Sequence, residues 1–337
     1  MTELPPLSLA SLFAAGAFVI AYVGTRLLIG VLSSRAILDH PTYRSSHEVP
    51  TPTGGGIAPV CGIAAAWLGI AALSVTAPPA LAPIIGLAAV LAALSWIDDL
   101  RGLGPALRLA VQAAVILAAL LLFPFPAPVF GGLLPPVLDT AATFLLWLWF
   151  VNLFNFMDGI DGIAGVQTAG IGVGVFGCAK IGKLDGHWLM LGLSAAAAAV
   201  GFLRWNWHPA KIFLGDVGSV PLGFLLGWLL LSLAAAGQPA PALILPMYFI
   251  ADATITLLRR AARGEKVWQP HREHFYQLAA RSGLRHDQIS GIVAVANLFL
   301  VALVMVAMRG LPWAAVTGAM AAVALLMFLL AKGGPTE

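Results

Sequence analysis

Long apolar runs, separated by short bursts of charge, are the feature of this sequence that most restricts its fold. Only 10% of the 337 residues are charged and 60% are hydrophobic, whereas a soluble domain carries about a quarter charged residues. An apolar run of about 18 or more residues is long enough to cross a bilayer as a helix. The pattern therefore predicts an all-α polytopic membrane protein.

The apolar runs predict about eleven spans in a single transmembrane domain that covers residues 1–337. The spans are expected near 8–31, 55–75, 80–97, 106–123, 138–156, 162–180, 187–204, 217–236, 240–258, 289–308 and 311–331. The loops of one membrane side are expected near 32–54, 98–105, 157–161, 205–216 and 259–288. Because the first ten residues lack the basic segment of a cleavable signal peptide, the first run is expected to remain as a span.

The distribution of Lys and Arg predicts the orientation. Most of them fall in or beside the loops that follow odd-numbered spans, whereas Lys180, Lys183 and Arg309 lie on the opposite side. The positive-inside rule then places the N-terminus outside and the C-terminus, with Lys332, in the cytoplasm. For the same reason the formal net charge of +3 indicates orientation and headgroup contact, and does not predict nucleic acid as a partner.

The stretch NLFNFMDGIDGIAG carries the strongest chemical signal. Asn152 and Asn155 precede Asp158 and Asp161 at the same three-residue spacing, which places side chains on neighbouring positions of a helical face. Acids at membrane depth are costly and normally face partners, ions or substrate. We predict a catalytic or metal-binding role for this pair of acids, with capping of the following helix by Asp161 as the alternative.

Two further acidic motifs border apolar spans. Asp98 and Asp99 directly follow a span, and adjacent carboxylates can bind Mg²⁺ or divide metal binding and proton transfer between them. Asp216 lies in FLGDVGS, where glycines let backbone N–H groups approach a phosphate while the carboxylate reaches a metal. The alternative for Asp98 and Asp99 is a solvated acidic pair at a helix end, paired with Arg101 or Arg108, and the alternative for Asp216 is a simple N-cap.

Two polar loops complete the set of motifs. PTPTGGG, which includes Thr51, can contact phosphate through its backbone with Arg44 and His47 nearby, or can be a rigid entry to the next span. In HREH, His271 and His274 lie three residues apart, a spacing that suits metal or phosphate binding. A basic loop that touches anionic headgroups is the alternative, and the spacing is not that of a zinc metalloprotease.

All of these motifs fall on one predicted membrane side. A secondary transporter needs ion or substrate groups near the midplane, with access from both sides. Clustering at one face instead favours an enzyme that works at the cytoplasmic interface. An ion-coupled transporter is the alternative from a different functional class.

Together the motifs resemble those of the polyprenyl-phosphate N-acetylhexosamine-1-phosphate transferases, glycosyltransferase family 4. The resemblance covers residues 40–290 and rests, in family order, on RSSHEVPTPTGGG, SWIDDLRGLGPALRL, NLFNFMDGIDGIAG, FLGDVGS and HREH. It implies transfer of a sugar 1-phosphate from a UDP-N-acetyl sugar to undecaprenyl phosphate in the bilayer, with release of UMP. It further implies Mg²⁺, with Mn²⁺ as the alternative ion, a site on the cytoplasmic face of the bacterial inner membrane, and compatibility with a homodimer.

The resemblance also implies roles for individual residues. By this likeness, the catalytic set is Asp98, Asp99, Asp158, Asp161, His271 and His274, the substrate-binding set is Arg44, His47, Thr51, Asn152, Asn155 and Arg272, and the metal set is Asp99, Asp158 and Asp216. A lipid-phosphate oxygen would attack the phosphorus that bears the sugar, and neutralisation of charge by metal and basic groups would lower the barrier.

One position departs from the family pattern. The common histidine motif is His-x-His-His, and here Glu273 occupies its third position, which argues against the peptidoglycan branch. HREHFYQLAARSG is more similar to the branch that initiates O-antigen and related surface glycans such as lipopolysaccharide, with an N-acetylhexosamine or a deoxy analogue as donor sugar. The peptidoglycan phospho-MurNAc-pentapeptide translocase is the alternative within the family. A CDP-alcohol phosphatidyltransferase is disfavoured because DGID does not continue as Asp-Gly-x-x-Ala-Arg.

Overall fold

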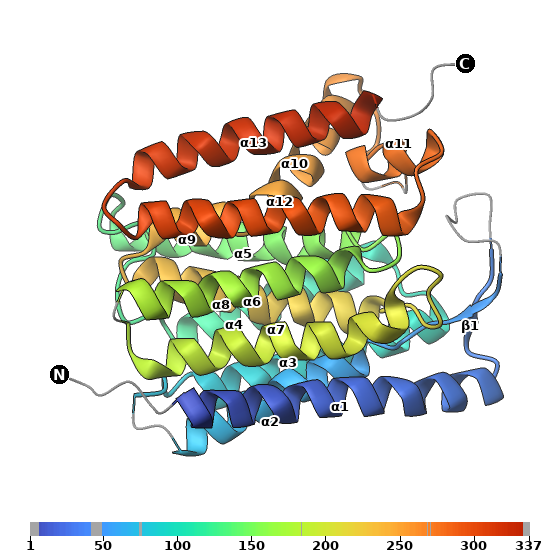
Figure 1. Ribbon diagram of the computed structural model, residues 1–337, viewed down its shortest axis with the longest axis horizontal. Coiled ribbons are helices and arrows are strands. Elements are labelled where there is room, and N and C mark those ends of the chain that lie inside the picture. Colours follow the sequence, from blue (N-terminus) through green and yellow to red (C-terminus); the bar gives the residue numbers. More distant parts are fainter. Residues whose placement is uncertain are drawn as a thin grey trace.

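The computed structural model of the chain describes residues 7–41, 49–73, 76–182, 184–267, 269 and 271–332, and forms a bundle of helices that run along one common direction (Figure 1). Within these residues, nine helices are long and apolar enough to cross a membrane. This confirms the prediction of an all-α polytopic membrane protein.

The nine long helices are α1 (Leu7–Ser34), α3 (Leu81–Arg101), α4 (Pro105–Leu122), α5 (Pro136–Phe156), α6 (Ile163–Gly182), α7 (Gly186–Asn206), α8 (Asp216–Ala235), α12 (His286–Ala307) and α13 (Pro312–Lys332). The shorter helices are α2 (Ile57–Leu73), α9 (Pro239–Ile244), α10 (Met247–Ala262) and α11 (Phe275–Arg281). Two-residue strands, β1 (Leu38–Asp39) and β2 (Thr51–Pro52), pair antiparallel, with Leu38 opposite Pro52.

Each of the eleven predicted runs contains a helix, but the ninth run is broken. Residues 240–258 are divided between α9 and α10, which are separated by Leu245 and Pro246. Proline has no N–H to donate to the preceding turn and its ring clashes with the carbonyl there, so α9 ends before Pro246. The number of membrane crossings and their orientation stay predictions. In Figure 1, α1 begins and α13 ends at opposite ends of the bundle, as an odd number of crossings requires.

The core of the bundle is built around α8. This helix is buried along nearly its whole length and packs against α3 and α5, while α7 packs between α1 and α6. The first residue of α8 is Asp216, so this central helix begins at one end of the bundle with an acid. The strand β1 and the helix α11 lie at that same end (Figure 1).

Candidate active site

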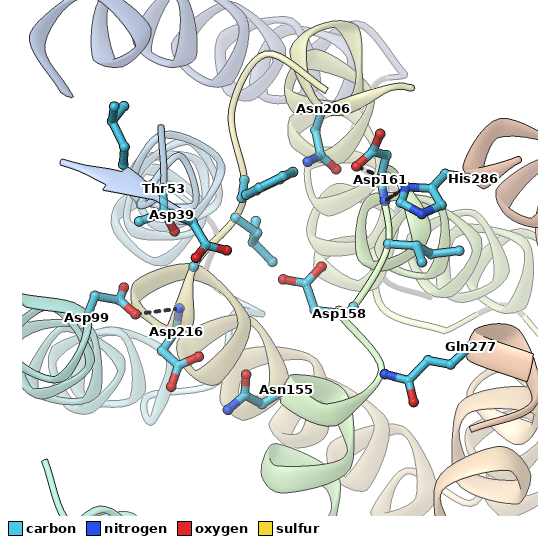
Figure 2. Close-up of a pocket in the computed structure, with 16 residues that line it drawn as sticks. Asp39, Thr53, Asp99, Asn155, Asp158, Asp161, Asn206, Asp216, Gln277 and His286 are labelled. Carbon is cyan, nitrogen blue, oxygen red and sulfur yellow. Dashed lines mark hydrogen bonds and ion pairs between the residues drawn. The ribbon is translucent and has the colours of Figure 1, made fainter. Parts of the chain in front are cut away.

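A polar cavity of about 480 Å³ lies at the end of the bundle where α8 begins (Figure 2). Five of its lining residues are acids, and a smaller number are apolar. The lining residues are Leu38, Asp39, Thr53, Asp99, Asn155, Asp158, Gly159, Ile160, Asp161, Asn206, Phe213, Leu214, Gly215, Asp216, Gln277 and His286. They come from the β1 region, the β2 turn, α3, the α5–α6 loop, the α7–α8 loop and the α11–α12 region. The fold therefore gathers acids from separate elements around one space.

Two glycine-rich segments, far apart in the chain, form one side of this cavity. Phe213 N–H donates to Pro52 O at 2.8 Å, and Gly55 N–H donates to Phe213 O at 2.8 Å. A Cβ on Gly56 would lie 2.2 Å from the Cα of Gly218, closer than two such atoms can approach. Glycine at these positions thus lets the PTPTGGG loop pack directly on the FLGDVGS segment.

Asp99 lies at the N-terminus of α8 as well as on the cavity wall. Its carboxylate accepts the backbone N–H of Asp216 at 3.1 Å and that of Val217 at 3.0 Å (Figure 2). These N–H groups have no partner within the helix, and a negative charge is favoured beside them. An acid from α3 therefore caps the central helix, where the sequence suggested only a local cap.

Asp98, although it precedes Asp99 directly, has different partners. It is buried, accepts the N–H of Leu103 at 2.6 Å, and pairs with Arg108 Nη1 at 2.8 Å. The same nitrogen of Arg108 lies 3.1 Å from a carboxylate oxygen of Asp216. Asp98 therefore does not line the cavity, and it acts on Asp216 through Arg108.

Asp158 lies on the α5–α6 loop, between the other acids of the cavity (Figure 2). Burial, together with the negative charges of Asp216, Asp161 and Asp99, raises the pKa of Asp158 well above its usual range. Repulsion of this kind is relieved when a cation is bound between the acids. The site is therefore built to receive positive charge.

The donor set fits Mg²⁺. Asp99, Asp158 and Asp216 reach the cavity from three different elements, and carboxylate oxygens are the protein ligands that Mg²⁺ prefers. Among the described residues, the acids and histidines whose ligand atoms lie within 4.8 Å of one another are instead Asp161, His208 and His286. The predicted metal set of Asp99, Asp158 and Asp216 stays a prediction.

Asp161 belongs to a separate network with two histidines. Its carboxylate lies 2.7 Å from His208 Nδ1 and 3.3 Å from His286 Nδ1, and it accepts the N–H of Ala210 at 3.1 Å. Burial alone would raise the pKa of Asp161, but the hydrogen bonds from His286 and His208 lower it below its usual range. The carboxylate therefore stays ionised, and it faces these partners instead of the first turn of α6.

Asp252, an acid within the ninth apolar run, binds the end of the HREH segment and the start of α11 through hydrogen bonds. His274 Nδ1 lies 3.1 Å from Asp252 Oδ1, and the N–H groups of Phe275 and Tyr276 donate to the same carboxylate at 3.0 and 3.3 Å. Both Asp252 and His274 are buried. His274 is therefore held by Asp252 and does not line the cavity.

Glu273, the departure from the family motif, takes part in an ion-pair cluster. It pairs with Arg263, and its carboxylate lies 3.6 Å from Arg260 Nε. Burial, with the positive charge that His274 and Arg260 can carry, lowers the pKa of the neighbouring His271 to about 4. His271 is therefore neutral at neutral pH, and Glu273 fixes the loop that carries it.

The structure brings together only part of the predicted residues. Those that line the cavity are Asp99, Asn155, Asp158, Asp161 and Asp216; those that do not are Thr51, Asp98, Asn152, His271, Arg272 and His274. Asn152 donates to Gln112 and to Leu148 O, at 2.9 and 2.8 Å. Arg44 and His47 lie outside the described residues. The catalytic and binding roles of all these residues stay predictions.

Several lining residues escaped the sequence analysis. They are Asp39, Asn206 and His286, with His208 beside them, and also Thr53 and Gln277, which lie in the PTPTGGG and HREHFYQLAARSG segments but were not themselves predicted as site residues. His208 and Asn206 stand in WNWHPAK, on the same predicted membrane side as the acids, so their place in the chain was a usable signal. His286 opens α12 and belongs to no motif of its own.

Comparisons with known proteins show what the chain is similar to. The model of glycosyl transferase family 4 matches residues 81–234. The decaprenyl-phosphate N-acetylglucosaminephosphotransferase of Mycobacterium leprae is 29% identical over 322 residues, which cover 84% of this chain and 80% of the relative. The probable undecaprenyl-phosphate N-acetylglucosaminyl 1-phosphate transferase of Bacillus subtilis is 27% identical over 288 residues, covering 80% and 78%. A phospho-N-acetylmuramoyl-pentapeptide-transferase of a Mycobacterium species is 32% identical over 289 residues, covering 70% and 78%.

Proposed function

Because the chain belongs to glycosyl transferase family 4 and is a polyprenyl-phosphate glycosyl-1-phosphate transferase, we propose that it transfers N-acetylglucosamine 1-phosphate, or a closely related N-acetylhexosamine 1-phosphate, from its UDP derivative to undecaprenyl phosphate. The observation that carries this proposal is the convergence of Asp99, Asp158 and Asp216 on one cavity. The names of the relatives from M. leprae and B. subtilis, both N-acetylglucosamine transferases, support the choice of sugar.

The reaction follows from what the cavity residues can do. An oxygen of the lipid phosphate attacks the phosphorus that bears the sugar, the bond from that phosphorus to the UMP oxygen breaks, and UMP leaves. When bound, Mg²⁺ neutralises the charge of the two approaching phosphate groups. Arg108 holds Asp216 in place through an ion pair.

The position of the cavity suits two substrates of different solubility. It opens at an end of a membrane-spanning bundle, where a polyprenyl phosphate in the bilayer and a nucleotide sugar in water can meet. The excess of Lys and Arg in the loops of this end supports its placement in the cytoplasm of a bacterium. The lipid product would then start a surface glycan of the O-antigen type.

A direct assay tests the sugar. Purified protein in detergent would be mixed with undecaprenyl phosphate, Mg²⁺ and one of several UDP-sugars, and release of UMP measured, with EDTA as the metal control. We expect UMP from UDP-N-acetylglucosamine or a related N-acetylhexosamine, and none in EDTA. Folded protein that releases no UMP from any donor would refute the proposal.

The main competing donor is UDP-MurNAc-pentapeptide. The 32% identity to a phospho-N-acetylmuramoyl-pentapeptide-transferase makes it the second candidate. UMP release from this donor alone would replace the proposed sugar with the peptidoglycan precursor.

A further inference from the structure

Three basic side chains surround the indole ring of one tryptophan. The guanidinium carbons of Arg26 and Arg204 lie 5.7 and 5.1 Å from the ring centroid of Trp205, and Lys211 Nζ lies 5.6 Å from it. Arg26 belongs to α1, Arg204 to α7 and Lys211 to the α7–α8 loop. Three separate elements therefore bring positive charge to one place, here called the Trp205 cluster.

Among the described residues, no acid balances the charge of the Trp205 cluster. All three basic side chains are exposed, and within the described part of the chain none of them forms an ion pair with an acid. The ring itself is held in place, because Trp205 Nε1 donates to Tyr22 O at 2.9 Å. An aromatic face attracts cations, but it carries no net charge, so the mutual repulsion of three cations remains.

The surroundings of the cluster indicate what supplies the negative charge. Val23 and Leu27, on α1 near Arg26, are 46% and 65% exposed, and Trp207, after α7, is 39% exposed. Apolar side chains beside exposed cations at the ends of membrane helices form a surface that suits acyl chains and an anionic headgroup together. A free phosphate ion would use the cations alone.

We propose that the Trp205 cluster is a binding site for the headgroup of an anionic phospholipid. Bound there, the lipid phosphate contacts Arg26 of α1, Arg204 near the end of α7, and Lys211 of the following loop. The N–H of Lys211 donates to Trp205 O at 2.8 Å, and that of its neighbour Ala210 donates to Asp161. The lipid thereby holds the α7–α8 loop, which supplies Phe213 and Leu214 to the cavity wall.

Lipid retention tests this site directly. Full-length protein in detergent would be incubated with phosphatidylglycerol or phosphatidylcholine, and bound lipid counted by native mass spectrometry. We expect phosphatidylglycerol to be retained in preference to phosphatidylcholine. In Arg26→Gln/Arg204→Gln, retention should fall by about 25-fold, since each of the two basic side chains beside an anionic headgroup contributes roughly fivefold to binding. Arg26→Lys/Arg204→Lys should restore it.

A matched variant controls for loss of charge in general. Arg259 lies over the ring of Phe275 and Lys332 over that of Phe328, at 5.6 and 4.3 Å, so Arg259→Gln/Lys332→Gln removes two ring-bound cations elsewhere. This variant should keep wild-type retention. Equal losses in both double variants, equal retention of the two lipids by wild type, or displacement of phosphatidylglycerol by an equal concentration of inorganic phosphate would each overturn the proposal.

A second measurement follows the loop and does not depend on turnover. Phosphatidylglycerol should slow amide hydrogen exchange of residues 207–215 in wild type, and should not do so in Arg26→Gln/Arg204→Gln. Unchanged exchange in wild type would refute the effect on the loop. Because neither readout needs a nucleotide sugar, failure of the transferase assay and failure of the lipid site are distinguishable.

Discussion

The carboxyl group of Asp158 lies on the α5–α6 loop, where burial and the charges of other cavity acids disfavour its ionised form. Its raised pKa means that, without a cation, the ionised form is disfavoured in the folded protein. Asp158→Asn removes this repulsion, so we expect a higher Tm in EDTA. Turnover should fall by about 10²-fold or more, because a metal ligand is lost. Tm from intrinsic fluorescence and kcat from UMP release check both effects; a lower Tm would contradict the electrostatic reasoning.

Asp216 differs from Asp158 because it has an ion-pair partner. Its carboxylate shares Arg108 with Asp98, so Asp216→Asn removes the repulsion between Asp216 and Asp158 but also takes one acid from Arg108. We expect the same severe loss of turnover, by about 10²-fold or more, and a smaller rise in Tm in EDTA than for Asp158→Asn. Near-normal kcat in this variant would exclude Asp216 as a metal ligand.

Gln277 is the residue of the HREHFYQ segment that lines the cavity. Gln288, which occupies the same position in a second capping box outside the cavity, serves as its control. Gln277 Oε1 accepts the N–H of His274 at 3.3 Å, and Gln288 Oε1 accepts that of Arg285 at 2.9 Å in the same kind of capping box. Gln277→Ala and Gln288→Ala should therefore each cost about 1 kcal/mol of stability. Only Gln277→Ala should also raise the KM for the nucleotide sugar. Equal kinetics of the two variants would remove Gln277 from the substrate site.

At the scale of elements, the contact between the glycine-rich loop and the start of α8 determines the shape of the cavity. Gly56→Ala would force a Cβ against the Cα of Gly218, whereas a Cβ on Gly86 of α3 meets nothing within 4 Å. We expect Gly56→Ala to lower the free energy of unfolding by about 1–3 kcal/mol and to lower turnover. Gly86→Ala should leave both unchanged, and a harmless Gly56→Ala would show that this contact can relax.

The buried Asp252 shows how one residue can organise an element. It lies in α10, yet the hydrogen bonds it accepts come from His274 and from the start of α11. An acid in an apolar helix is tolerated when such partners satisfy it. The position of the histidine segment at the cavity edge is therefore set from within the bundle.

At the scale of the whole molecule, the distribution of basic residues predicts which end faces the cytoplasm. Leu133, 86% exposed, lies in the loop between α4 and α5, and Lys266 is exposed in the loop after α10. In a background with Cys61 and Cys178 replaced by Ser, a membrane-impermeant maleimide should label Leu133→Cys in intact cells. Lys266→Cys should be labelled only after lysis. The reverse pattern would invert the orientation.

The sequence alone determined the class of fold, because hydrophobic length is a local property that requires no knowledge of contacts. It also located the acids at the ends of spans, and the order of motifs was enough to indicate the family. For Asp98 and Asp99 it offered an ion pair with Arg101 or Arg108 as the alternative to a shared site. It could not predict that the two neighbours separate, so that Asp98 pairs with Arg108 while Asp99 caps α8.

Only the tertiary structure decided which polar side chains share the cavity. His286 and Asp161 are separated by 125 residues yet bonded, and Lys211, Arg26 and Trp205 meet only because α1 packs beside α7. Such contacts depend on how helices pack and rotate against one another, which a hydrophobic pattern does not specify. The lengths of the apolar runs determine which segments form membrane helices. The packing of those helices determines which polar side chains meet at their ends.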